Sequence, residues 1–573
     1  MASRRTPIFF VSTLALAALY GCSSMSKEYA EAPSSSRSSG ANSSPVATVE
    51  LDAVGGEGRD MSESEIVTRT GAVAPGRSEA QKQKKADSGQ LSLIRGMVAG
   101  QPAPPAEPVD QGGRVVPEGG STNHGVNGFD LAAEDHLSTF AIDVDTASYT
   151  MARKNLQNGY LPAEASVRVE EFVNYLPYEY KRPVDSDPFS VDFEASPSPW
   201  DEQYTLVRIG VQGKKVAYDQ RKPVNLTFLV DVSGSMRSSD KLDLLKESLI
   251  MLTEELEDGD TVAIATYAGA TKVVLPPTPI SQAAKIKKSL SGLTAGGSTA
   301  MNSGIQLAYN LADETYRDGS VNRVIVCSDG DANVGQTDTN SMANGIKGYA
   351  KKGITLTTLG FGNGNFQDTR MEQLANQGDG NYFYIDSRRE ARRVLVDRMT
   401  STMEVIAKDV KIQVDWNPEA VHAYRLVGYE NRDVADRDFR NDEVDAGEIG
   451  SGHQVTALYE VALTGDSGDL ATVRVRNKAP GPDSPAVERT WTLDSSDLRP
   501  AFSETSRQFQ IAASAGYFAE ILRGSPWVHE ISLTQVAEMA NHAKRVEYPE
   551  DAELVELIRT AARLKGEGMI SRR

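Results

Sequence analysis

Cysteine is scarce in this sequence: only Cys22 and Cys327 occur among its 573 residues. Cys22 ends an N-terminal apolar segment, so the rest of the chain has no second cysteine that could pair with Cys327. The composition therefore argues against an internal disulfide. Cys327 lies in the apolar stretch "RVIVCS", a context that favours a buried and unreactive thiol.

Positive charge is scarce as well. The chain has 60 Lys and Arg against 79 Asp and Glu, which gives a formal net charge of -19 and a pI near 5.0. Nucleic-acid binding needs a basic face that displaces counterions from phosphates, so this composition argues against a nucleic-acid partner. It argues equally against electrostatic docking on anionic lipid.

The N-terminus carries an apolar run, Pro7 to Tyr20, that is too short to span a bilayer. Two arginines precede it, which is the order of a secretory signal. The run ends in "LYGC", which resembles the lipobox of bacterial lipoproteins, whose cysteine is acylated and becomes the mature N-terminus. The resemblance implies a lipid anchor at Cys22 as the only membrane contact, and a place in the cell envelope facing the periplasm or exterior. Ser23 is compatible with outer-membrane sorting if the source has two membranes. A plain secretory signal with an incidental cysteine is the alternative.

Composition divides the chain into five parts. Residues 1–22 form the signal, and residues 23–125, rich in Ser, Ala, Gly and Pro, are predicted to be a disordered linker with a reach of roughly 50–60 Å. An N-terminal flanking domain is predicted over 126–220, and an α/β domain over 221–405. A C-terminal flanking domain, β-rich and then helical, is predicted over 406–573.

Strands and helices alternate in the predicted α/β domain. Apolar runs predict strands at 224–230, 262–267, 324–327 and 354–361. The first helical pattern places leucines on one face, namely Leu242, Leu245, Leu249, Leu252 and Leu256. This alternation predicts a doubly wound, mostly parallel sheet with helices on both faces. In such sheets ligands bind beyond the carboxyl ends of the strands.

The flanks on either side of this domain are expected to depend on each other. The N-terminal flank offers two alternating strands, at 189–194 and 204–212, and an isolated pair of strands is only marginally stable in water. The strands predicted after Asp409 are available to complete a sheet with them. We therefore expect the α/β domain to be inserted into a β-sandwich built from both flanks.

Polar residues follow three of the predicted strands. The stretch "FLVDVSGSM" places Asp231, Ser233 and Ser235 at alternate positions; "AGGSTAMNSGI" places Thr299 before a helix, and "VIVCSDGDAN" places Asp329 after a buried strand. In a doubly wound sheet these loops can meet at the carboxyl edge. Three hydroxyls and two carboxylates suit Mg²⁺, a small hard cation that prefers oxygen ligands and keeps some waters. No histidine lies between Lys222 and Ile406, so the set is poor for zinc or copper.

The same three segments resemble the metal-ion-dependent adhesion site (MIDAS) of von Willebrand factor type A (VWA) domains. Carried over residue by residue, the resemblance makes Ser233, Ser235 and Thr299 the hydroxyl ligands of Mg²⁺, Mn²⁺ or Ca²⁺. It makes Asp231 and Asp329 the carboxylates that act through water. The flanking segments, among them "STFAIDVDTASYTMARKNLQNGYLP" and "VGYENRDVADRDFRNDEVDAGEIGSGHQVTALYEV", resemble a bacterial family of lipoproteins built around a type A domain. The resemblance implies a cell-envelope protein with a metal-dependent interaction site.

The predicted function is therefore protein binding and not catalysis. Neutral hydroxyls and water-bridged carboxylates leave the ion with an open coordination position, which a carboxylate of a partner protein would fill. The sequence does not name that partner. The first alternative is a metal-independent structural lipoprotein, in which these residues only cap turns and helices.

A second, less favoured alternative is a serine hydrolase that uses the same serines as nucleophiles. The usual Gly-x-Ser-x-Gly elbow is absent here, and a serine nucleophile needs a base within hydrogen-bond reach. The nearest candidate bases, His422 and His453, would approach only across a domain boundary.

An acidic run from Glu430 to Glu448 invites comparison with a calcium-binding loop. Asp436 and Asp438 are followed by Arg440 where a third ligand should stand, and no glycine occupies the turn position. We expect a solvated, partly ordered loop.

Overall fold

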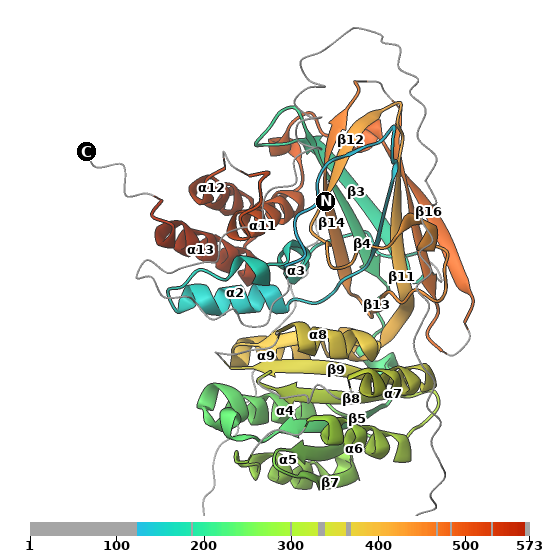
Figure 1. Cartoon of the computed structure of the whole chain (residues 1–573), viewed down its shortest axis with the longest axis vertical. Helices are drawn as coiled ribbons and strands as arrows, with labels where there is room; N and C mark the ends of the chain where they lie inside the picture. Colours follow the sequence, from blue (N-terminus) through green and yellow to red (C-terminus); the bar gives the residue numbers. More distant parts are fainter. Residues whose placement is uncertain are drawn as a thin grey trace, which may run out of the picture. The chain divides into compact units, whose positions relative to one another are not determined.

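The computed structural model describes residues 123–184, 187–297, 301–330, 339–362, 368–465, 468–481, 484–528 and 531–567 (Figure 1). All of them belong to one unit, Lys85–Arg573. The signal, Cys22, the predicted linker up to residue 122, and Thr299 lie outside the described residues.

The α/β domain is built on a six-stranded sheet in the order β10-β9-β8-β5-β6-β7. Its strands are β5 (Val224–Asp231), β6 (Thr261–Tyr267), β7 (Thr271–Pro279), β8 (Val321–Ser328), β9 (Ile354–Phe361) and β10 (Tyr382–Ile385). All neighbouring strands are parallel except β6 and β7. Of these six strands β5 comes first in the chain, and it lies inside the sheet with later strands on both sides, so the predicted doubly wound fold is confirmed.

Helices cover both faces of this sheet because the strands are apolar on both sides. They are α4 (Leu244–Glu254), α5 (Ala283–Ser291), α6 (Met301–Glu314), α7 (Thr339–Lys352), α8 (Asp368–Gln377), α9 (Arg388–Arg392) and α10 (Met399–Met403). Phe228 of β5 packs in one core with Leu249 of α4, and its neighbour Leu229 packs in another with Ile305 of α6. The five leucines of the predicted helix face are all buried, and so is Cys327.

The flanks form two antiparallel sheets with a shared core. The first has the order β1-β12-β14-β4-β3, and in the second β11 pairs with β13, β15 and β2, and β15 with β16. The strands are β1 (Asp130–Leu131), β2 (Leu137–Ala141), β3 (Phe189–Pro197), β4 (Thr205–Gly213), β11 (Val405–Trp416), β12 (Val421–Val427), β13 (Gly447–Gly450), β14 (Gln454–Leu463), β15 (Asp469–Lys478) and β16 (Ala486–Asp494). The side chain of Trp416 stacks on Tyr424 and meets Tyr459 edge-on in this core.

Strand pairing joins the two flanks directly. Strand β4, before the α/β domain, pairs with β14, after it, from Thr205 opposite Val461 to Gln212 opposite Gln454. Strand β2 pairs with β11 in the other sheet. The prediction that the α/β domain is inserted into a sandwich made from both flanks is therefore confirmed.

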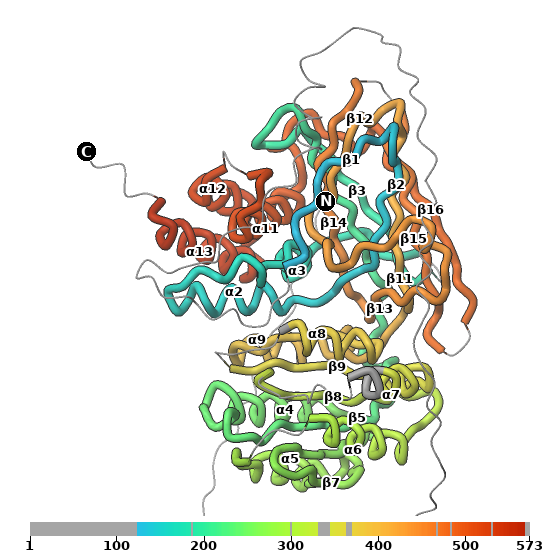
Figure 2. Tube along the Cα trace, in the orientation of Figure 1, coloured from blue at the N-terminus to red at the C-terminus, as the bar shows by residue number. Residues whose placement is uncertain are grey.

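A helical layer from both flanks packs beside the sandwich. Its helices are α2 (Ala147–Gln157), α3 (Val169–Tyr175), α11 (Arg507–Leu522), α12 (Leu533–Ala543) and α13 (Pro549–Leu564). Figure 2 shows the N-terminal helices α2 and α3 beside the C-terminal ones, and α2 contacts α13. Phe172 of α3 meets Phe518 of α11 edge-on, with ring centroids 5.8 Å apart.

Arg153 of α2 connects three parts of the fold. Its guanidinium is fully buried and lies 2.7 Å from Asp386 and 2.8 Å from Glu390, both in the α/β domain. It also lies 2.9 Å from Glu553 of α13. Burial alone would raise the pKa of Glu390, but Arg393 and Arg153 lower it to about 2. Glu390 is therefore ionised beside the guanidinium, and the network ties the α/β domain to both flanks.

The acidic run from Glu430 to Glu448 differs from the loop that we expected. It contains a short 3-10 turn at Asp436–Asp438, and its side chains make specific contacts. Glu430 lies 2.9 Å from Arg523, and Asp442 lies 2.6 Å from Arg476. Ion pairs with residues distant in the sequence therefore hold this segment in place. The spacing of acidic residues within the segment does not predict these pairs.

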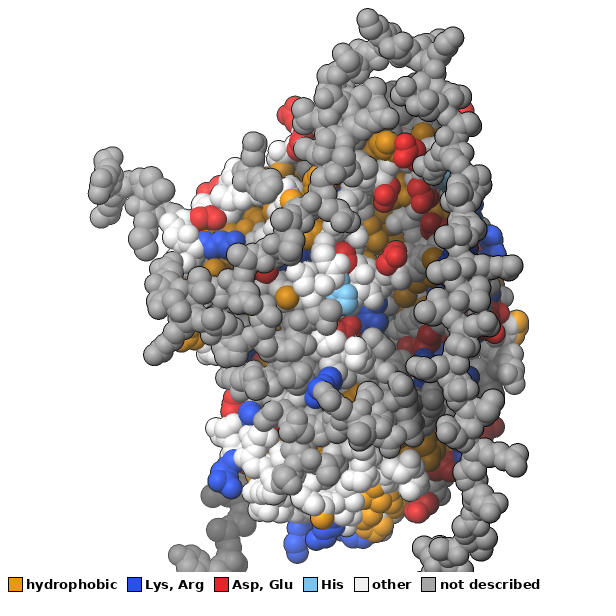
Figure 3. Space-filling model, in the orientation of Figure 1, with side chains coloured by type: hydrophobic (Ala, Val, Ile, Leu, Met, Phe, Trp, Pro, Cys, Tyr) orange, Lys and Arg blue, Asp and Glu red, His pale blue; other side chains and the backbone are white. Residues whose placement is uncertain are grey.

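Charged side chains are mixed over the described surface. On the part of the face that Figure 3 describes, the basic side chains form small separate groups among acidic and polar ones. Among the described residues, no helix is long and apolar enough to cross a membrane.

His453 lies at the junction of the α/β domain and the sandwich, in the lining of a cavity of about 220 Å³. Its Nδ1 accepts a hydrogen bond from the Gly450 N–H at 3.1 Å. Burial, together with Arg398 and Arg323, lowers the pKa of His453 to about 3. The imidazole is therefore neutral in the folded protein at neutral and mildly acidic pH.

This lowered pKa predicts acid sensitivity. The unfolded chain takes up a proton on His453 below pH 6.5 and the folded chain does not, so the free energy of unfolding should fall by about 2 kcal/mol between pH 6.5 and pH 5. His453→Asn keeps an acceptor for Gly450 and should remove that part of the pH dependence. Urea unfolding of both proteins at the two pH values measures it. Equal slopes for wild type and variant would contradict the prediction.

Candidate metal centre

The first loop of the predicted site begins where β5 leaves the sheet. The Ser233 N–H donates to Asp231 Oδ1 at 2.8 Å, and the Met236 N–H donates to the Ser233 carbonyl at 3.2 Å. These bonds turn the chain into a short 3-10 helix, Gly234–Arg237, followed by a π-helical turn before α4. Met236 is fully buried in the core and holds the loop against the sheet.

The two hydroxyls of this loop converge. Ser233 Oγ and Ser235 Oγ lie 2.8 Å apart. Ser233 is buried, whereas Ser235 is partly exposed and its neighbour Gly234 is exposed. The pair of oxygens therefore lies at the surface of the domain.

Asp329 lies at the end of the neighbouring strand, β8, and is almost completely buried. Ser328 joins its loop to the first one: Ser328 Oγ donates to Asp231 Oδ2 at 3.1 Å and accepts from the Gly330 N–H at 3.1 Å. The structure thus brings Asp231, Ser233, Ser235 and Asp329 to one edge of the sheet. The sequence analysis missed Ser328, although it directly precedes Asp329.

Lys241 is a second residue that the sequence analysis missed. Its ammonium lies 2.8 Å from Asp329 Oδ2 and provides a positive charge at the site. Gly362, at the end of β9, has φ of +88°, and any side chain there would collide with the aliphatic part of Lys241. The glycine therefore leaves room for the lysine to reach Asp329.

The third loop is described only up to residue 297, and Thr299 lies outside the described residues. The Gly296 N–H donates to the Val232 carbonyl at 2.7 Å, and the Gly234 N–H donates to the Gly297 carbonyl at 3.0 Å. Gly297 has φ of +98°, a conformation that favours glycine. Residues 296 and 297 are thus bound to the first loop.

Asp231 is fully buried, and its surroundings oppose its charge. Burial raises the pKa of the Asp231 carboxyl, hydrogen bonds from Ser233 lower it in part, and the charge of Asp329 raises it further. Burial, and then the charge of Asp231, also raise the pKa of Tyr267 well above its usual value. A cation at this edge would relieve the repulsion between the two carboxylates.

The arrangement fits a hard divalent cation. Adjacent ligands of an octahedral Mg²⁺ lie about 2.9 Å apart, since each bond is about 2.0–2.1 Å long, and the two serine oxygens lie 2.8 Å apart. Each carboxylate oxygen of Asp231 already accepts a hydrogen bond, which suits a contact with the ion through water. The donors are all oxygens, as Mg²⁺ prefers. The ligand assignment itself stays a prediction.

The hydrolase alternative gains no support from these contacts. The hydroxyls of Ser233 and Ser235 hydrogen-bond to each other. In the part of the chain that the structure describes, no histidine forms a hydrogen bond with either.

Comparison with known proteins assigns the domains. Residues 225–397 match the family model for the von Willebrand factor type A domain, and residues 121–208 match a model described as von Willebrand factor. Residues 401–469 and 463–564 match the C-terminal model of "Uncharacterized protein YfbK". The YfbK protein of Escherichia coli K12 is 37% identical over 459 residues, which cover 75% of this chain and 78% of YfbK. The chain belongs to the YfbK family of VWA-domain proteins.

More distant similarities are confined to shorter segments or to the fold. Human inter-alpha-trypsin inhibitor heavy chain H4 is 31% identical over 148 residues, which cover 24% of this chain and 16% of that protein. Among solved structures, a von Willebrand factor type A protein from Catenulispora acidiphila covers 65% of this chain and 89% of its own, at 16% identity and a TM-score of 0.39. VWA domains mediate protein–protein interaction, often through a divalent metal, so the family places this YfbK relative among interaction proteins.

Proposed function

We propose that the protein is a cell-envelope lipoprotein that binds another protein through a divalent cation, Mg²⁺ or a similar ion such as Mn²⁺ or Ca²⁺. The ligands would be Ser233, Ser235 and Thr299, with Asp231 and Asp329 acting through water. The observation that carries the proposal is the pair of serine oxygens 2.8 Å apart, beside two buried carboxylates at the ends of adjacent strands.

The residues present explain why a partner's carboxylate would bind. A divalent ion held here supplies a Lewis acid with an open or water-filled coordination position. Ser233 and Ser235 are neutral, so they leave the positive charge largely uncompensated. A carboxylate from a partner would bind strongly only in a dry contact, and the loops after Ser235 and Asp329 would have to exclude water around it.

The test is capture from cell envelopes with the immobilised full chain, in Mg²⁺ and in chelator. Wild type should retain partners in Mg²⁺ and release them in chelator, and Asp231→Asn should retain none in either condition. Asp243→Asn is a matched control, because Asp243 is an exposed carboxylate just after the same loop, 3.3 Å from Lys246. Capture that is indifferent to chelator would overturn the proposal.

The Lys241–Asp329 ion pair favours a second candidate function, a structural lipoprotein that needs no metal. The ammonium neutralises Asp329 without an ion. In that case stability and partner capture would both be unaffected by chelator.

Under the main proposal, Lys241 competes with the metal for Asp329. Lys241→Met removes the competing charge and keeps the aliphatic chain beside Gly362, so the affinity for Mg²⁺ should rise by about tenfold. Calorimetric titration of both proteins measures it. Weaker binding by the variant would show that the ammonium supports the site.

The anchor is a separate part of the proposal. Lipid attachment needs the thiol of Cys22, so Cys22→Ser should move the protein from the detergent phase to the soluble envelope fraction. The part of the chain that the structure describes begins at residue 123, about a hundred residues after Cys22, so wild type and Cys22→Ser should have the same melting temperature. Unchanged detergent partitioning of the variant would contradict the anchor.

A further inference from the structure

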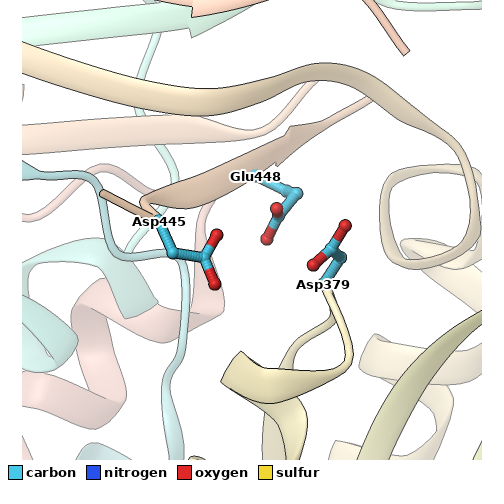
Figure 4. Close-up of side chains that lie close together, drawn as sticks. All are labelled: Asp379, Asp445 and Glu448. Atoms are coloured by element: carbon cyan, nitrogen blue, oxygen red, sulfur yellow. The ribbon is translucent and has the colours of Figure 1, made fainter. Parts of the chain in front are cut away.

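Three carboxylates converge where the VWA domain meets the sandwich. Asp379 comes from the turn between α8 and β10, whereas Asp445 precedes β13 and Glu448 lies within it. Their ligand oxygens all lie within 4.8 Å of one another. Figure 4 shows the three side chains turned toward a common space.

Glu448 is the member of this cluster that most needs a partner. It is 8% exposed, and no hydrogen bond or ion pair joins its side chain to another residue in the described part of the chain. Its carboxylate is directed toward Asp379 and Asp445 (Figure 4). A buried carboxylate without a partner is costly, so its position beside two others indicates a missing positive charge.

Basic side chains lie near this cluster, but among the described residues none of them pairs directly with the Glu448 carboxylate. Lys408 forms an ion pair with Asp379, and Lys347 also acts on Asp445. The buried Arg323 guanidinium acts on Glu448 but donates its hydrogen bonds to Thr357 and to the Thr402 carbonyl. Asp409, a further neighbour, has its own partner, Lys478, at 2.7 Å. A cation bound among the three carboxylates would give Glu448 the direct partner that these side chains do not provide.

The backbone fixes the positions of these side chains. Asp379 has φ of +47° and stands between Gly378 and Gly380, where a Cβ would collide with Leu356. Gly447, just before Glu448, packs against the carbonyl of Ile142, so it too excludes a side chain. Close packing within the VWA domain therefore holds Asp379, and close packing between the two flanks holds Glu448.

We propose that Asp379, Asp445 and Glu448 bind a second divalent cation, of the Ca²⁺ type, at the junction of the VWA domain and the sandwich. Ca²⁺ takes six to eight oxygen ligands at about 2.3–2.6 Å, so oxygens bound to one ion lie up to about 5 Å apart. The observed limit of 4.8 Å meets this condition. Carboxylates used in one- or two-oxygen contacts, together with water, would complete the shell.

Such an ion would restrain the VWA domain against the sandwich, because its ligands come from both. This role does not depend on the proposed adhesion site, which lies at the ends of β5 and β8. The two sites can therefore be separated by mutation.

The test uses the full chain carrying Asp231→Asn. Its binding of Ca²⁺ is measured by calorimetric titration, and its melting temperature is measured with and without Ca²⁺. The substitution disables the proposed adhesion site, so any Ca²⁺ that this variant still binds is expected at the carboxylate cluster of the junction. We expect one Ca²⁺ per chain and a higher melting temperature with the ion. Adding Glu448→Gln or Asp379→Asn should weaken binding by about tenfold or more and abolish the thermal shift.

Asp442→Asn is the control, since Asp442 belongs to the same acidic segment but pairs with Arg476 outside the cluster. It should leave Ca²⁺ binding unchanged. Glu448→Gln removes an unpaired buried charge, so the variant should fold. No binding at millimolar Ca²⁺, or binding that survives both Glu448→Gln and Asp379→Asn, would overturn the proposal. Failure of the adhesion site would appear instead as equal metal binding with and without Asp231→Asn.

Discussion

Asp231→Ala should lower the affinity for Mg²⁺ by at least about a hundredfold, or about 3 kcal/mol. The carboxylate accepts hydrogen bonds from the Ser233 N–H and from Ser328 Oγ, so it both positions the first loop and links it to the second. Its loss removes a negative charge from the site and releases the serine hydroxyls from their common orientation. Calorimetric titration with Mg²⁺ and Mn²⁺ measures the effect.

Asp231→Ala should lower the free energy of unfolding by less than it reduces the favourable free energy of Mg²⁺ binding. Burial raises the pKa of Asp231, so its ionised form is already unfavourable in the folded chain, and we expect a loss of less than about 2 kcal/mol. Asp231→Asn keeps the size of the side chain and an acceptor for the Ser233 N–H but removes the negative charge, so it measures the contribution of the charge alone. Thr299→Ala should weaken binding less than either, since water can replace one hydroxyl. Wild-type affinity in Asp231→Ala would exclude this residue from the site.

Arg153→Met should destabilise the protein by about 3–5 kcal/mol. The substitution leaves Asp386 and Glu390 buried and without the guanidinium that lies 2.7 and 2.8 Å from them. It also removes the link to Glu553 of α13. The contacts between the VWA domain and both flanks should weaken together, which urea unfolding would show as a lower midpoint of the first transition.

Arg440→Met is the matched control for this experiment. Arg440 makes two hydrogen bonds to Glu488, both 2.9 Å long, but its side chain is mostly exposed, so the loss should be below about 1 kcal/mol. Arg153→Lys keeps the charge and loses the forked geometry, and an intermediate effect is expected. An Arg153→Met midpoint equal to that of the control would contradict the role given to the network.

Much of the fold follows from local pattern. The apolar runs and the leucine face of the first helix predict a parallel sheet with helices on both sides, because burial on both faces demands continuous apolar strands. The shortage of strands before the VWA domain was enough to predict that the later strands would pair with them, as β4 does with β14. Burial of Cys327 followed from its apolar neighbours.

The sites are predictable only in part. Asp231, Ser233 and Ser235 stand at fixed spacing in one loop, so a motif reveals them. Lys241 and Ser328 act across loops, and only the folded chain brings their partners within reach. The cluster at the junction is a stronger case, since Asp379 and Glu448 come from separate domains. The spacing of acidic residues from Glu430 to Glu448 does not match a calcium-binding loop. Their carboxylates are positioned by contacts with residues distant in the sequence.

The most direct test of the adhesion site is an anomalous difference map from crystals grown with Mn²⁺. We predict a peak about 2.1 Å from both Ser233 Oγ and Ser235 Oγ, with the Lys241 ammonium displaced from its position 2.8 Å from Asp329. A peak at Asp379 and Glu448 would be a separate result, because it concerns the junction alone. A map without density between the two serines, with Lys241 still bound to Asp329, would contradict metal-dependent binding by this protein.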